Sequence, residues 1–275
     1  MPTPVHRYLK EIFTNHLHFT PTPGLIASFE RDLACANPSL MKASLLEVKD
    51  AGKLKGVRDA EVRGVIFSVY NRKLAEQSRM FPVFHAFETA FRSILAIQLE
   101  ALYGAPDWWR PIEHKLRRGE RLSPLTRIDG KPMSQDALAT LGHLLRSELD
   151  RPDGATKLVS LTDGYGLMAV ANLQHVQKLF VQHWGPLLSV FRANRAGSPP
   201  MTKQVFDDQF SKIREARNDV YHHNSTRDLG RVTEIVEDLL DRLDINLSFT
   251  MTQVSAAKPR PITFRMPREA RHHIY

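Results

Sequence analysis

The feature that most constrains the fold is a helical repeat of apolar residues, with no comparable pattern for strands. One apolar stripe follows intervals of three and four residues and comprises Val232, Ile235, Val236, Leu239, Leu240 and Leu243. Further helices are expected over residues 60–79, 82–103, 135–148, 166–183 and 202–223, separated by breaks that contain Pro and Gly. With 42% hydrophobic residues the chain can bury a core, so the sequence predicts an all-α fold.

Composition divides the chain into three parts. Residues 1–55 hold short helical pieces and are expected to form an N-terminal helical extension packed on a helical domain of residues 60–250. Residues 251–275 are basic, contain several prolines and are expected to form an extended tail. Without a long apolar run or a signal-peptide pattern, we expect no membrane association and a cytoplasmic location. Cys35 is the single cysteine, which excludes an internal disulfide and a zinc site built from cysteines. The histidines show no metal-ligand pattern and the chain carries no cofactor motif, so we expect neither a metal nor a cofactor.

The net charge of +8 comes from two segments. Residues 110–131 contain seven Lys or Arg against three acids, and residues 251–275 contain five against one. Each segment is either a solvated loop or tail, or a surface that faces a polyanion. A run of charge alone does not decide between these interpretations.

A group of polar residues stands out on the helix expected over residues 202–223. At about 100° per residue, one arc of about 140° contains Arg214, Arg217, Asn218, Tyr221 and His222. An apolar stripe beside it comprises Phe206, Phe210, Ile213, Ala216 and Val220. His223 points away from this arc if the helix continues that far. Arg offers paired donors to phosphate oxygens and His can transfer a proton at neutral pH; the other interpretation is a helix end where these side chains cap carbonyls and pair with acids.

The pattern Arg217-Asn218-x-x-x-His222 resembles the signature of the HEPN superfamily, in which an Arg and a His on a late helix form a ribonuclease site. The chain is similar to the Abi-like, abortive-infection branch of that superfamily. The landmarks that carry this resemblance are, in order, Asn71, Glu88, Arg92, Tyr103-Gly104, Trp108-Trp109, the Gly-rich helix start at 163–166, Trp184 and Arg214. Asp163 and Asn224 stand where the family usually has an aromatic residue and a Glu.

The resemblance implies a HEPN-like helical bundle and a metal-independent endoribonuclease. In this chemistry the 2′-OH of RNA attacks the adjacent phosphate and leaves a cyclic phosphate, with His222 as general acid or base, Arg217 on the phosphate and Asn218 positioning either. Candidates for substrate contact are Arg214, Tyr221, His223, Arg92 and Glu88. The last two are alternatively only a surface pair at i and i+4.

One His222 per chain does not easily serve both sides of an in-line displacement, so a homodimer with a composite active site is expected. The resemblance further implies a defence effector of the abortive-infection or toxin type, restrained by an antitoxin or a phage-derived trigger. The alternative is a non-catalytic helical module that binds nucleic acid or protein on the same scaffold. We interpret Trp108 and Trp109 as core or interface anchors rather than base-stacking platforms.

Overall fold

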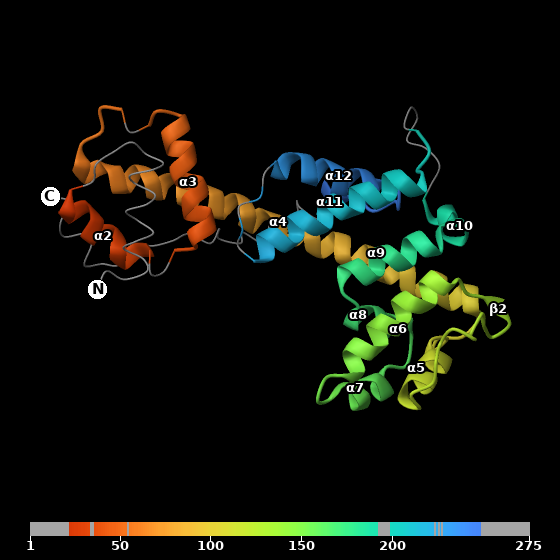
Figure 1. Cartoon of the computed structure of the whole chain (residues 1–275). Coiled ribbons are helices and arrows are strands. Elements are labelled where there is room, and N and C mark those ends of the chain that lie inside the picture. Colours follow the sequence, from red (N-terminus) through yellow and green to blue (C-terminus); the bar gives the residue numbers. More distant parts are fainter. Residues whose placement is uncertain are drawn as a thin grey trace. The chain divides into compact units, whose positions relative to one another are not determined.

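A computed structural model describes residues 22–33, 36–53, 55–191, 199–222, 224, 226 and 228–248. Helices make up most of these residues, so the expected all-α class is confirmed (Figure 1). No helix among the described residues is long and apolar enough to cross a bilayer. The expected basic tail, residues 251–275, lies outside the described residues.

The chain forms two compact units. The first comprises Met1–Phe81, Ala216–Gly230 and Val254–Tyr275, and the second comprises Pro82–Glu215 and Arg231–Gln253. Helices α4 (Asp59–Tyr103) and α11 (Lys203–Tyr221) each contribute to both units. The division into residues 1–55, 60–250 and 251–275 stays a prediction.

The first unit packs α2 (Pro23–Leu33) and α3 (Pro38–Asp50) with the beginning of α4. Its core includes Phe29, Leu40, Met41, Leu45, Val62, Ile66, Phe67 and Tyr70. The start of α3 is fixed by Asn37, whose side chain accepts a hydrogen bond of 2.9 Å from the Leu40 N–H. A buried ion pair between Asp32 and Arg63 ties α2 to α4.

Helix α4 continues through Pro82, where the sequence predicts a break between two helices. The prediction of a break was wrong, although Pro82 removes one backbone hydrogen bond at a cost of about 3 kcal/mol. On the following turns Phe84, Phe87 and Phe91 are fully buried. We attribute the unbroken helix to this aromatic packing, because burying one such side chain contributes about 1.5–3 kcal/mol.

The second unit surrounds the later part of α4 with short helices and one hairpin. In chain order these are α5 (Arg110–Arg117), β1 (Arg127–Ile128), β2 (Lys131–Pro132), α6 (Gln135–Leu149), α7 (Gly154–Ser160), α8 (Gly164–Val170), α9 (Leu173–Gln182), α10 (Trp184–Leu187), the 3₁₀ turn η1 (Leu188–Val190), and, after α11, α12 (Leu229–Asp241). Helix α6 packs against α5, α7 and α9. Phe91 contacts the rings of Phe180, Phe206 and Phe210 at centroid distances of 5.7, 5.8 and 5.4 Å.

Two local details of the second unit differ from expectation. The helix expected over 166–183 is divided into α8 and α9, because the Asn172 side chain accepts a 2.8 Å hydrogen bond from the His175 N–H and starts a new helix. The antiparallel hairpin β1–β2 was not predicted. Its turn residues Asp129 and Gly130 have φ values of 44° and 76°, which is the left-handed conformation that an Asp-Gly pair favours.

Candidate functional site

Helix α11 presents the predicted polar arc beside the predicted apolar stripe. The stripe residues Phe206, Phe210, Ile213, Ala216 and Val220 are all buried, so this part of the prediction is confirmed. Arg214 and Arg217 are half-buried, whereas Asn218, Tyr221 and His222 are exposed. Arg217, Asn218, Tyr221 and His222 belong to the first unit, and we call these four residues the α11 cluster; Arg214 belongs to the second unit. The core contact of the stripe holds the helix, and the α11 cluster remains open to a ligand.

Within the α11 cluster, Tyr221 holds the guanidinium of Arg217. The Arg217 guanidinium lies 4.1 Å from the centroid of the Tyr221 ring, and Nη1 donates a 3.3 Å hydrogen bond to the Asn218 Oδ1. The Tyr221 ring in turn packs on Phe81 of α4, with centroids 5.1 Å apart. Tyr221 was predicted as a substrate contact; in the structure it supports Arg217, while its role toward substrate stays a prediction.

The turn that carries His222 is anchored by Gln77 of α4. The His222 N–H donates to the Asn218 carbonyl at 2.9 Å, which continues the helical pattern one residue past Tyr221. Two residues later, the Asn224 carbonyl accepts a 2.5 Å hydrogen bond from the buried Gln77 side chain. The Asn224 N–H donates to the Asp219 carbonyl at 2.7 Å. No sequence pattern pointed to Gln77, and His223 lies outside the described residues.

Arg92 and Glu88 have structural partners in the second unit. The Arg92 Nη1 donates to the carbonyl oxygens of Met168 and, at 2.6 Å, of Ala171, at the junction between α8 and α9. Its Nη2 lies 3.4 Å from the Glu88 Oε2. Arg92 therefore stabilises the end of α8, and its predicted contact with substrate stays a prediction.

The basic segment 110–131 is largely engaged in internal contacts. Glu113 is buried and accepts hydrogen bonds from Arg110 at 3.2 Å and from Arg117. Arg117 also donates to the Ala155 carbonyl at 2.7 Å, and Arg110 donates to the carbonyls of Leu158 and Val159, both at 3.0 Å. These two arginines fasten α7 to α5.

The other charges of this segment are half-buried or exposed. Hydrogen bonds from Arg118 and Lys115 lower the pKa of Glu120 to about 2. Within the described part of the chain, Arg121, Arg127 and Lys131 make no hydrogen bond or ion pair through their side chains. Among the described residues, these three are the cations of the segment without an internal partner. If the segment faces a polyanion, these are the side chains available to contact it.

The core of the second unit holds polar groups that sequence analysis did not single out. His183 donates through Nδ1 to the Leu179 carbonyl at 2.8 Å, and its Nε2 accepts a 2.8 Å hydrogen bond from the Tyr103 hydroxyl. Burial raises the pKa of Tyr103 to about 12 and lowers the pKa of His183. Trp108 and Trp109 are also buried, which confirms their interpretation as core anchors.

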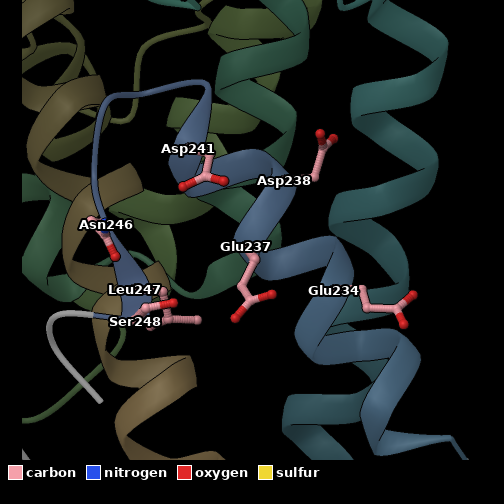
Figure 2. A pocket seen from close by; sticks show the side chains of 7 residues that line it. All are labelled: Glu234, Glu237, Asp238, Asp241, Asn246, Leu247 and Ser248. Atoms are coloured by element: carbon pink, nitrogen blue, oxygen red, sulfur yellow. The ribbon is translucent and has the colours of Figure 1, made fainter. Parts of the chain in front are cut away.

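Acidic side chains also gather along α12 but do not form a metal centre. Glu234, Glu237, Asp238 and Asp241 line a hollow of about 320 Å³, and Figure 2 shows their carboxylates pointing in different directions from the helix. Among the described residues there is no group of three or more His, Cys, Asp or Glu side chains suited to hold a metal ion. The α11 cluster combines a side chain that can transfer a proton, His222, with one that can bind phosphate, Arg217.

Comparison with known protein families, curated proteins and solved structures found no match to this chain.

Proposed function

We propose that this protein is a metal-independent endoribonuclease with a HEPN-like bundle, and that the α11 cluster is its active site. The observation that carries the proposal is the position of Arg217, Asn218 and His222 on the open face of one helix, with the Arg217 guanidinium held against the Tyr221 ring. A guanidinium fixed before substrate arrives loses less freedom on binding phosphate. This arrangement supplies a phosphate donor and a proton-transfer group within two helical turns.

The proposed reaction needs only groups that the RNA and these residues provide. The scissile phosphate binds to Arg217 and to the amide of Asn218, and the 2′-OH attacks phosphorus while a general base removes its proton. The bond from phosphorus to the 5′-oxygen breaks, and a general acid protonates that oxygen. The products are a 2′,3′-cyclic phosphate and a free 5′-OH.

A second copy of the chain completes the proposed site. His222 on one protomer acts as the base and His222 of the other acts as the acid, because the two protons move on opposite sides of the phosphorus atom. The exposure of His222 and Tyr221 is compatible with an interface between two such helices. In this proposal the enzyme works in the cytoplasm as an abortive-infection or toxin effector, restrained by an antitoxin or a phage-derived trigger.

The decisive experiment is cleavage of mixed cellular RNA by the purified full-length protein in EDTA. The wild type is expected to produce fragments that end in 2′,3′-cyclic phosphate, and His222→Ala and Arg217→Ala are expected to lose this activity. Matched controls are His85→Ala, an exposed histidine of the second unit, and Arg58→Ala, an exposed arginine of the first unit. Cleavage that survives both active-site substitutions would disprove the site assignment.

A non-catalytic RNA-binding module on the same scaffold is the second candidate. It is favoured by the engagement of Arg92 with backbone carbonyls, which gives that arginine a structural role without catalysis. Tight binding of RNA with no cleavage under any tested condition would support this candidate over the endoribonuclease.

A further inference from the structure

A groove of about 480 Å³ runs along α6 in the second unit and is independent of the α11 cluster. One wall is the exposed face of α6, and the other is the segment from Arg121 to Ser123. Its volume is within the range of about 300–1,000 Å³ that is usual for small-molecule sites. The groove belongs entirely to one unit, so its geometry depends only on that unit.

Leu122 lies against Gly142 and the Ser123 carbonyl approaches Gln135, so we infer that the segment runs antiparallel to α6 and that Arg121 lies toward the end of the groove with His143 and Arg146. Arg121 and Arg146 are exposed, and within the described part of the chain their side chains make no hydrogen bond or ion pair. Next to them His143 Nδ1 lies 3.2 Å from Nε2 of the buried His175. This end of the groove therefore combines two uncommitted guanidinium groups with an oriented imidazole.

The buried His175 determines which nitrogen of His143 is available. The Nδ1 of His175 is buried and has no hydrogen-bond partner in the described structure. A buried N–H without an acceptor is rarer than a buried acceptor without a donor, so we assign the proton of His175 to Nε2. His175 then donates to His143 Nδ1, which leaves the Nε2–H of His143 as a donor toward a ligand.

The opposite end of the groove offers neutral hydrogen-bonding groups. Gln135 opens α6, and its Nε2 approaches the carbonyls of Ser123 and Leu125 at 3.5 and 3.4 Å. These contacts use the amide N–H groups and leave the Gln135 carbonyl oxygen and the Ser123 hydroxyl for a ligand. Gln135 and Arg146 are about 16 Å apart along the helix, at 1.5 Å per residue.

Between the two ends the floor of the groove is apolar. Leu122 and Leu138, which are 9% and 2% exposed, line this part together with the exposed Ala139. Gly142 allows Leu122 to approach the helix, because a Cβ at that position would lie 2.7 Å from the Leu122 Cδ1. A planar ring can rest on this floor without a polar group beneath it.

We propose that this groove binds a nucleoside phosphate. The phosphate is held by Arg121, Arg146 and His143, the sugar and base lie over Leu122 and Leu138, and the base edge bonds to Gln135 and Ser123. Charge complementarity at one end and neutral donors and acceptors at the other select a ligand that is anionic at only one end. This site is separate from the proposed ribonuclease reaction and does not depend on it.

The test is calorimetric titration of the full-length His222→Ala protein, which is expected to be inactive toward RNA, with AMP, GMP, CMP and UMP in EDTA. We expect saturable binding of at least one of them at one site per chain. Arg121→Ala and Arg146→Ala should each weaken that binding about tenfold or more, since each removes a charge-assisted contact. Lys131→Ala, which removes an exposed cation outside the groove, should leave the affinity unchanged.

Further titrations test which parts of the nucleotide are needed for binding. Adenosine and ribose 5-phosphate should bind at least tenfold more weakly than AMP if AMP is the nucleotide bound, and the corresponding fragments serve for another base. Ala139→Trp, at an exposed position of the groove, should block binding without disturbing the core. The proposal is overturned if no mononucleotide binds, if the nucleoside or the sugar phosphate binds equally well, or if Ala139→Trp keeps the wild-type affinity. A single-stranded RNA that binds where no mononucleotide does would also overturn it.

Discussion

The α11 cluster and the basic segment 110–131 both carry positive charge in the sequence, but their arginines have different surroundings in the structure. Arg217 is half-buried against one aromatic ring on a helix face whose neighbours Asn218 and His222 are exposed. Arg117 instead donates to the buried carboxylate of Glu113 and to the Ala155 carbonyl. Positive charge in a sequence therefore does not show which cations can meet a ligand; the internal acceptors that each cation reaches, buried acids and backbone carbonyls alike, determine it.

The two regions illustrate two roles of a cation, one in stability and one in contact with a ligand. A cation that pairs with a buried acid prevents a large loss of stability, because an uncompensated buried charge is unfavourable by several kcal/mol. A cation on an open face contributes little to stability and remains accessible to a ligand. The two regions should thus respond differently to the same substitution.

The largest expected effect is on catalysis by Arg217. We expect Arg217→Ala to lower RNA cleavage by about 100-fold or more, because it removes a charged donor from the phosphate in the transition state. Arg117→Ala should leave the cleavage rate of folded protein unchanged while lowering the melting temperature. Single-turnover rates and thermal melts of both variants check this, and a reversed pattern would contradict the comparison.

The next effect concerns the stability of the second unit. Glu113→Gln preserves the shape of the side chain and removes its charge, which leaves Arg110 and Arg117 without their buried counter-charge. We expect the free energy of unfolding to fall by about 1.5–3 kcal/mol, the usual contribution of hydrogen bonds to a charged group, measured by urea denaturation. Glu120→Gln, at an exposed ion pair, is the matched control and should have no measurable effect. Equal stability of the two variants would show that burial of Glu113 is not what distinguishes it.

As the pH is lowered from neutral, the protein should first lose stability through the buried histidines of the second unit and only at lower pH through its carboxylates. Burial, with contributions from His143 and Lys178, lowers the pKa of His175 from 6.5 to about 4. Below pH 6.5 the unfolded chain binds a proton that the folded chain refuses, so stability falls as the pH decreases toward 4. From His175 we expect unfolding at pH 5 to be easier than at pH 7 by about 1–2 kcal/mol.

His175→Gln is the control for this pH dependence. It should reduce the difference in unfolding free energy between pH 7 and pH 5, while the lowered pKa of His183 preserves part of it. Urea denaturation at both pH values measures the two slopes. An unchanged pH dependence in His175→Gln would mean that His175 is protonated equally in the folded and unfolded chain.

The sequence predicts features that depend on neighbours along the chain and misses those that depend on distant ones. The apolar stripe of α11 followed from the spacing of Phe206, Phe210 and Ile213. The hairpin and the break between α8 and α9 had local signals, the Asp129-Gly130 pair and the capping residue Asn172. These signals were missed because the prediction relied on helical periodicity. The uninterrupted course of α4 through Pro82 depends on tertiary packing, which no local rule contains.

The same division applies to the candidate site. The shared face of Arg217, Asn218 and His222 follows from helical geometry alone. The anchor of the following turn does not, because Gln77 and Asn224 are 147 residues apart in sequence. Likewise the sequence shows the charges of Arg117 and Glu113 but not that Glu113 is buried. Because Glu113 is buried, its ion pair with Arg117 is strong and keeps Arg117 from binding a ligand.

The smallest expected effect isolates the support that Tyr221 gives to Arg217. Tyr221→Phe retains the ring and should cleave RNA at the wild-type rate, whereas Tyr221→Leu removes the cation–π contact and should lower the rate about 2- to 5-fold, equivalent to about 0.5–1 kcal/mol. Tyr165→Leu, at an exposed tyrosine of the second unit, is the matched control. If Tyr221→Phe is as slow as Tyr221→Leu, the hydroxyl acts on the substrate and the ring is not the support. If both variants are as fast as the wild type, the orientation of Arg217 depends on Asn218 and the helix alone.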